Sequence, residues 1–213
     1  MKFFLRFGNM LVLFLILLLG IIAFFKTDVK DKFIKPKYEE VIKSDIDYDS
    51  DGLDDYTDIL NGAKEFISTK PKYKSKYYDG GYPTDEYRVC TDIIWYALKN
   101  AGYDFKTLID EDIKNNKDEY DEDVGDENID FRRVRNIKVY LDRNVLKLPN
   151  DSDFNPGDIV VYKKHIAIVS DKVNSKNENY ILHQHMYQAY EYDGLFKNEI
   201  LGHYRWRLND GEK

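Results

Sequence analysis

Hydrophobic residues recur at helical spacing in the first half of the domain and at strand spacing in the second. Apolar side chains every three or four positions predict three helices, at 59–67, 90–102 and 131–142. After Pro149 the period changes, and short apolar runs predict four strands of an antiparallel sheet, at 158–162, 165–170, 179–184 and 203–207. Helices first and strands afterwards predict an α+β domain.

The N-terminal region carries a different pattern, an uncharged apolar run over residues 10–25. A helix of this length spans about 24 Å, which is slightly short for the hydrocarbon core of a bilayer. Lys2 and Arg6 precede the run and Lys26 follows it, so the domain is expected outside the cytoplasm. We therefore expect a single-pass transmembrane signal anchor. A cleaved secretory signal, which would release the protein, and a core helix of a soluble protein are the alternatives.

These patterns divide the chain into five segments. They are a cytoplasmic positive flank (1–9), the signal anchor (10–25), a charged stalk (26–58), the folded domain (59–208) and a tail (209–213). The stalk is assigned because residues 26–45 are highly charged, contain Pro36 and show no sustained apolar period.

Composition excludes several classes of function. The 213 residues are 43% hydrophobic and 15% aromatic, which excludes a chain that is disordered throughout. With a formal charge of −7, the chain has no overall excess of basic residues, which a protein that binds nucleic acid typically has. The single cysteine, Cys90, excludes an intramolecular disulfide and a cysteine-based zinc cluster.

Acidic residues gather in two stretches, 45–58 and 104–130, and the second is typical of a solvated helix and loop. The first follows the order of a calcium loop, with Gly52 at the sixth position for the sharp turn. The predicted ligands of this structural calcium are Asp47, Asp49, Asp51, Asp55 and Asp58. The alternative is an acidic helix start, in which the last acids of the stretch face the positive end of the next helix.

The single cysteine and the histidines carry the candidate chemistry. Cys90 stands where a loop enters a helix, so backbone N–H groups and a nearby imidazolium are expected to favour its thiolate. His165 lies on a predicted strand and is the candidate base. If strands 165–170 and 179–184 pair across a turn near Asn174, His183 lies opposite His165 on the same face, and His185 is a reserve candidate. The alternative is that Cys90 is a small core residue and the histidines are structural.

Seven motifs in order resemble a known family. They are Y-x-x-G-G (77–81), V-C-T-D (89–92), I-D-F-R-R-V (129–134), P-G-D-I-V (156–160), H-I-A-I-V (165–169), L-H-Q (182–184) and G-H-Y-R (202–205). Over roughly residues 60–208 the chain resembles bacterial envelope proteins of the family named domain of unknown function 1287. That family in turn resembles a branch of the NlpC-type, papain-like cell-wall cysteine peptidases.

The resemblance implies a papain-like fold, in which N-terminal helices pack on a small antiparallel sheet, and a Cys-His-His triad. Within it Cys90 is the nucleophile, His165 the general base and His183 the residue that orients the base. Tyr77 corresponds to a tyrosine that lines the oxyanion region of the peptidases.

The remaining motif residues are assigned to substrate: Asp92, Arg132 and Arg133 are expected to bind it. An internal cluster of ion pairs with Asp130 is the alternative for the two arginines. Two positions depart from the family pattern, since Phe131 replaces a histidine and Gln184 replaces an asparagine. These departures leave the shape of the pocket and the substrate open.

The sequence therefore predicts a membrane-anchored extracytoplasmic cysteine hydrolase that acts on peptide or amide bonds of peptidoglycan stem peptides. Catalysis is expected to need no cofactor. The expected partners are peptidoglycan or another cell-wall polymer, and the bacterial cell membrane through the N-terminal helix. A non-catalytic module that binds the cell envelope with the same fold, and an acyltransferase with the same triad, are the alternatives.

Overall fold

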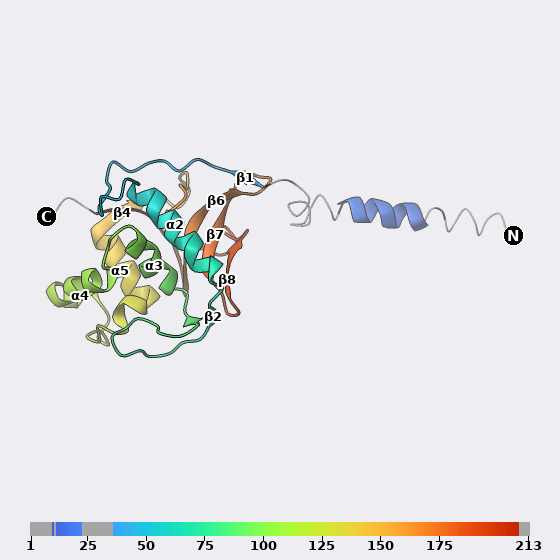
Figure 1. Cartoon of the computed structure of the whole chain (residues 1–213). Helices are drawn as coiled ribbons and strands as arrows, with labels where there is room; N and C mark the ends of the chain where they lie inside the picture. Colours follow the sequence, from blue (N-terminus) through green and yellow to red (C-terminus); the bar gives the residue numbers. More distant parts are fainter. Residues whose placement is uncertain (1–9, 11, 23–35, 209–213) are drawn as a thin grey trace. The chain divides into compact units, whose positions relative to one another are not determined.

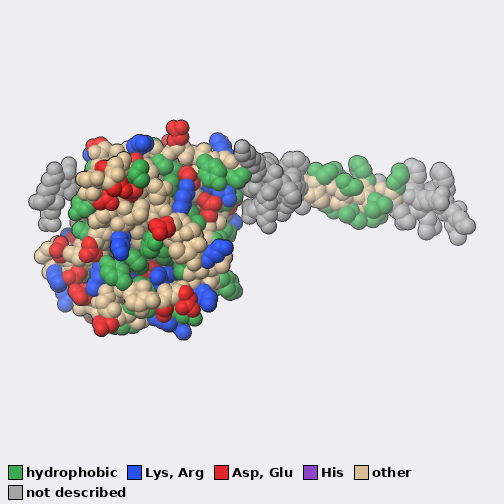
Figure 2. Space-filling view, viewed as in Figure 1, with side chains coloured by type: hydrophobic (Ala, Val, Ile, Leu, Met, Phe, Trp, Pro, Cys, Tyr) green, Lys and Arg blue, Asp and Glu red, His purple; other side chains and the backbone are tan. Residues whose placement is uncertain are grey.

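The computed structural model describes residues 10, 12–22 and 36–208 and divides the chain into two units, Met1–Lys37 and Tyr38–Lys213. In the first unit, residues 10 and 12–22 are helical and their apolar side chains are exposed (Figure 2). No helix among the described residues has both the length and the apolar content needed to cross a membrane. This finding contradicts the predicted transmembrane helix over 10–25. The predicted flank, the tail and residues 23–35 lie outside the described residues.

The helices of the second unit lie in the first half of the domain. They are α2 (Asp55–Ser68), α3 (Asp92–Asn100), α4 (Phe105–Asn115) and α5 (Val134–Asn144), with 3-10 turns η2 (Lys117–Glu119) and η3 (Asp130–Arg132). Helix α2 begins four residues before its apolar pattern because the Asp54 side chain accepts a hydrogen bond from the Thr57 N–H and caps the helix. Asp104 caps α4 in the same way, which makes the start of the second acidic stretch a helix that buries Phe105.

Within the described residues, seven strands form one sheet in the order β4-β9-β5-β6-β7-β8, and the short β1 pairs with β6. The strands are β1 (Lys37–Tyr38), β4 (Val145–Leu148), β5 (Ile159–Tyr162), β6 (His165–Val173), β7 (Asn179–Gln184), β8 (Ala189–Tyr192) and β9 (Ile200–Leu208). Neighbouring strands along the main path pair antiparallel, as predicted. The sequence did not predict β4 and β8, which form the two ends of that path. A second, parallel sheet consists of β2 (Lys72–Tyr73) and β3 (Tyr87–Arg88).

The helices pack against one face of the sheet (Figure 1), and the other face has its own small core. On β6, Ile166 and Ile168 belong to the core beneath the helices, whereas Ala167 and Val169 belong to the second core. Because side chains alternate along a strand, His165 lies on the same face as Ala167. On β7 the same alternation places His183 with Ile181, which also belongs to the second core.

The hairpin of β6 and β7 has a different register from the one predicted. Ile168 pairs with Leu182 and Val169 with Ile181, which is shifted by two residues, so His165 and His183 are diagonal neighbours rather than opposite residues. The hairpin turn lies further along the chain than assumed, where Asn177 adopts a positive φ of 61°, and a register shift follows between Val169 and Val173. A shift of two residues keeps every side chain on its face, so the two histidines still meet.

The surface of the domain mixes both signs of charge. On the face seen in Figure 2, acidic and basic side chains are interspersed among apolar and uncharged ones. Many of them form surface ion pairs, such as Lys64 with Asp171 at 2.6 Å.

Candidate active site

A cavity of about 760 Å³ brings the three predicted triad residues together. Cys90, His165 and His183 all line it, although they come from the start of α3, the start of β6 and the end of β7. Four tyrosines also line the cavity: Tyr73, Tyr162, Tyr190 and Tyr192. The loop between β5 and β6 adds the exposed Lys163 and Lys164. The cavity therefore combines one thiol, imidazole rings, aromatic surface and positive charge.

Cys90 lies two residues before the first residue of α3, in a turn that the Asp92 N–H closes on the Val89 carbonyl at 3.0 Å. Burial raises the pKa of the thiol to about 11, and the charge of Asp92 acts in the same direction. The backbone N–H groups of Ile166 and Thr91 oppose this shift by hydrogen bonding to the sulfur, but they do not outweigh burial. The predicted N–H contacts are therefore present, whereas the predicted stabilisation of the thiolate is not.

The two histidines form a direct contact. Nε2 of His165 lies 2.9 Å from Nδ1 of His183, and the two rings are nearly perpendicular, at 80°. The His183 ring stacks on Tyr192 with an interplanar angle of 1° and meets the edge of Tyr190. These contacts fix the orientation of His183, and through it the orientation of His165. This contact uses Nε2 of His165 and does not involve its other ring nitrogen, Nδ1.

Burial keeps both imidazoles neutral at physiological pH. It lowers the pKa of His165 to about 4, with a further contribution from the charge of His185. It lowers the pKa of His183 to about 3, and the charges of His165 and His185 add to that effect. The cavity is therefore lined by a neutral thiol and neutral imidazoles rather than by the expected thiolate and imidazolium.

Asp92 and Arg132, which were predicted to bind substrate, form an internal ion pair instead. Nε of Arg132 lies 2.7 Å from Oδ1 of Asp92 and Nη2 lies 2.9 Å from Oδ2, and both side chains are at least 99% buried. The Asp92 carboxylate also accepts hydrogen bonds from the Trp95 indole and the Val89 N–H. Neither residue is among those that line the cavity. The pair anchors the turn that carries Cys90, because the Val89 N–H donates to Asp92.

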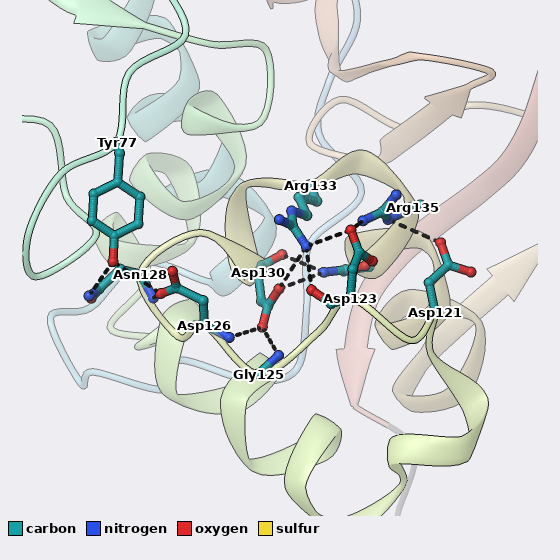
Figure 3. A network of polar contacts seen from close by, with 10 residues as sticks. Tyr77, Asp121, Asp123, Gly125, Asp126, Asn128, Asp130, Arg133 and Arg135 are labelled. Carbon is teal, nitrogen blue, oxygen red and sulfur yellow. Dashed lines mark hydrogen bonds and ion pairs between the residues drawn. The ribbon is translucent and has the colours of Figure 1, made fainter.

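Arg133 belongs to a second cluster, shown in Figure 3, outside the lining of the cavity. It lies 3.3 Å from Asp123 and 3.4 Å from Asp130, whose other oxygen accepts the N–H groups of Gly125 and Asp126. Arg133 therefore pairs with Asp130 as the ion-pair alternative describes, whereas the ion pair of Arg132 is with Asp92.

Tyr77 lies at the edge of the same cluster. Its hydroxyl donates to Asp126 at 3.3 Å and accepts from Asn128, and the side chain is exposed (Figure 3). Tyr77 does not line the cavity either, so the structure does not place it at an oxyanion site beside Cys90.

The predicted calcium residues lie before and in the first turn of α2. Asp47, Asp49 and Asp51 are exposed, and their carboxylate oxygens lie within 4.8 Å of one another. Asp55 and Asp58 are buried on the helix. Burial, and then the charges of the neighbouring carboxylates, raise the pKa of Asp58 to about 6.

The sequence analysis missed the aromatic wall of the cavity. Tyr190 and Tyr192 lie on β8, a strand that was not predicted, and they pair opposite His183 and Ile181. The short alternation A-Y-E-Y over 189–192 was the available signal, because aromatic residues at every second position are typical of a strand.

Comparisons with known proteins identify the family. The model of the family described as a domain of unknown function, DUF1287, matches residues 60–206. A protein of Escherichia coli K12, named uncharacterized protein YijF, is 33% identical over 164 residues, which cover 70% of this chain and 80% of that protein. No solved structure matches the chain. The family match spans most of the chain and includes Cys90, His165 and His183, so the chain belongs to the family of the domain of unknown function 1287.

Proposed function

We propose that the domain is a cysteine hydrolase that cleaves peptide or amide bonds, with Cys90 as nucleophile, His165 as general base and His183 as the residue that orients the base. The observation that carries the proposal is the 2.9 Å contact between the two imidazoles in a cavity that Cys90 also lines. A nucleophile, a base and a third group that holds the base are the arrangement that activated-nucleophile catalysis requires. The resemblance to NlpC-type peptidases supports the same roles.

In the proposed reaction, His165 carries a proton between Cys90, the leaving group and water. Nδ1 of His165 takes the thiol proton of Cys90 while the sulfur attacks the carbonyl carbon of the substrate. The imidazolium then donates this proton to the leaving amine, which departs as the carbon–nitrogen bond breaks and leaves a thioester. Water, deprotonated by His165, attacks the thioester and releases the acid and the thiol. During both steps Nε2–H of His165 donates to Nδ1 of His183, which keeps the ring in place.

The backbone N–H groups at the start of α3 are the proposed stabilisers of the oxyanion. They belong to the turn that holds Cys90, so the nucleophile and these donors move as one rigid unit with the helix.

The proposed substrate is a peptide of the bacterial cell wall, such as a stem peptide of peptidoglycan. Lys163 and Lys164 at the cavity suit the carboxylates of such peptides, and the tyrosines suit their aliphatic parts. This substrate class implies that the domain acts outside the cytoplasm.

One observation favours a second candidate function. Burial raises the pKa of the Cys90 thiol, which keeps it protonated, and lowers the pKa of His165. A module that binds wall peptides without cleaving them needs no reactive thiol, and the same cavity would serve it. The two candidates differ in one measurable respect, which is whether the chemistry of Cys90 is required.

The test of the proposal uses the single cysteine of the full chain. We expect purified protein to release new amine and carboxyl ends from isolated peptidoglycan, measured by mass spectrometry of the soluble products. Prior alkylation with iodoacetamide at about pH 9, followed by removal of the reagent, blocks Cys90, the only thiol of the chain, and is expected to abolish release. Equal release by alkylated and untreated protein would refute a cysteine mechanism. If neither sample releases cleavage products and both still bind the wall, the result favours the binding module.

The pH dependence of hydrolysis follows from the two shifted pKa values. The active form shares one proton between Cys90 and His165, so it is lost below the pKa of the base and above that of the thiol. With values of about 4 and about 11, kcat/KM is expected to stay flat from about pH 5 to about pH 9. With the ordinary pKa values of histidine and cysteine, kcat/KM would instead fall below about pH 6.5 and above about pH 8.5. An acid limb near pH 6.5 in initial-rate measurements would contradict the burial of His165 described here.

A further inference from the structure

The segment between β8 and β9 contains a turn, residues 194–197, that lies beside the imidazole pair. The Lys197 N–H closes this turn by donating to the Gly194 carbonyl at 3.2 Å. Leu195, inside the turn, is buried in the second core with only 2% of the residue exposed. Gly194 and Lys197 both line the cavity. The turn is therefore anchored in the core at one end of the cavity.

The turn holds the ring of Tyr192. This ring occupies the space that a side chain at position 194 would need, since a Cβ on Gly194 would lie 2.3 Å from Cδ1 and Cε1 of the ring. Nζ of Lys197 lies 4.4 Å from the centroid of the same ring and 3.1 Å from its hydroxyl, to which it donates. The turn thus fixes the ring that stacks on His183.

Tyr162 lies on the other side of the imidazole pair and contacts the same turn. Its ring centroid is 6.2 Å from that of His165, with an interplanar angle of 24°. Its buried hydroxyl donates to the Leu195 carbonyl at 2.9 Å. Four rings therefore follow one another, and the turn contacts both outer ones: Tyr162, His165, His183 and Tyr192.

His183 depends on ring packing for its orientation. Only 3% of the residue is exposed, and its Nδ1 is occupied by the contact with His165. Its Nε2 has no hydrogen-bond partner among the described residues. Side chains that support a reactive group are locked either by packing or by hydrogen bonds of their own. With no hydrogen bond to Nε2 in the described part of the chain, the contacts with Tyr190 and Tyr192 are what lock the ring.

We propose, building on the roles proposed above for His165 and His183, that Tyr192 is a positioning residue for the base and that the turn at 194–197 holds it in place. Tyr192 acts through His183, whose ring it fixes against His165. Without the stacked ring, both imidazoles can rotate out of their 2.9 Å contact. A misplacement of about 1 Å can cost about 10²-fold in rate. Gly194 is therefore required for activity although it has no reactive group.

The same ring keeps water away from the pair. Burial is the largest cause that lowers the pKa of His165 to about 4 and the pKa of His183 to about 3. A displaced Tyr192 ring admits water to His183, so both pKa values are expected to rise toward the ordinary value of about 6.5. Gly194→Ala changes none of the titratable groups whose rings or charges lie around the pair: Tyr162, His185, Tyr190, Tyr192 and Lys197.

Histidine titration followed by NMR tests this role without requiring hydrolysis. The full chain contains four histidines, and His165→Gln and His183→Gln assign the two resonances. We expect both midpoints of the wild type to lie below about pH 5, and Gly194→Ala to raise them by at least about one pH unit. Tyr192→Leu removes the ring and is expected to raise them similarly, whereas Tyr192→Phe keeps the ring and is expected to restore low midpoints.

Gly202→Ala is the matched control, because it makes the same change beside a different tyrosine. A Cβ on Gly202 would lie 2.3 Å from the Tyr204 hydroxyl, and Tyr204 is not among the residues that line the cavity. A lower Tm without a change in the two midpoints is the expected result for this variant.

Kinetics on a soluble peptide give a second readout. Gly194→Ala is expected to lower kcat about 10²-fold while KM changes less than about threefold, because the base is misplaced and the lysines of the cavity are unchanged. If the wild type hydrolyses no peptide, the proposed function fails, and the NMR midpoints alone decide the role of the turn.

Several results would overturn this role. They are wild-type midpoints near about pH 6.5, unchanged midpoints in folded Gly194→Ala and Tyr192→Leu, an equal shift in Tyr192→Phe and Tyr192→Leu, or an equal shift in Gly202→Ala and Gly194→Ala. If either glycine variant does not fold, the comparison of Tyr192→Leu with Tyr192→Phe decides.

Discussion

Replacing Cys90 with alanine is expected to lower kcat/KM for peptide hydrolysis by at least about 10³-fold, to the rate of the uncatalysed background. Without the sulfur no thioester forms, and the 2.9 Å contact between His165 and His183 has no nucleophile to activate. The cavity, its tyrosines and its lysines remain, so the affinity for uncleaved peptide should change by less than about tenfold. Initial rates on a soluble muropeptide and calorimetric binding to the same peptide measure the two quantities separately.

The controls for this substitution address folding and chemistry. Cys90 is half-buried, and the loss of one sulfur atom is expected to cost about 1 kcal/mol, which a Tm measurement detects. Cys90→Ser keeps the size and the polar atom but supplies a poorer nucleophile at the same position, so it should be nearly as inactive as the alanine variant. Hydrolysis by Cys90→Ala within tenfold of wild type would exclude the proposed mechanism.

The contact between His165 and His183 could be predicted from the sequence because it depends on alternation rather than on register. The assumed turn at Asn174 was wrong by two residues, yet His165 and His183 kept their common face, since a strand has a side-chain period of two. A shift of one residue would have separated them. The tyrosines of β8 were missed because a four-residue edge strand carries too little pattern to be distinguished from a loop.

The electrostatic state of the site could not be predicted from the sequence. The position of Cys90 before a helix indicated N–H donors, and these are present. Their effect is smaller than that of burial, and the extent of burial depends on how the helix layer packs against β6. The same reason explains Asp92 and Arg132: they belong to two motifs that are far apart along the chain, and only the fold shows that they pair in the core.

Replacing Arg132 with methionine is expected to lower the free energy of unfolding by about 3–5 kcal/mol. Methionine fills much of the space, but it leaves the buried Asp92 carboxylate with only the Trp95 indole and the Val89 N–H as partners. It also removes the hydrogen bond from Nη1 to the Lys76 carbonyl at 3.0 Å. Urea denaturation of the full chain followed by circular dichroism measures the change as a lower midpoint at a similar slope.

Arg133→Met is the matched control, because the adjacent arginine undergoes the same chemical change in a different environment. Its ion pairs with Asp123 and Asp130 are longer, and 30% of its side chain is exposed, so solvent screens them and the expected loss is less than about 1 kcal/mol. A double variant, Asp92→Leu with Arg132→Met, removes both buried charges and should be more stable than Arg132→Met alone, because no unpaired ion remains. If Arg132→Met and Arg133→Met lower the midpoint equally, the buried pair is not what holds the turn of Cys90. If Arg132→Met alone destabilises and the double variant recovers stability, the cost lies in the stranded carboxylate, and the arginine is retained to position that turn rather than to bind substrate.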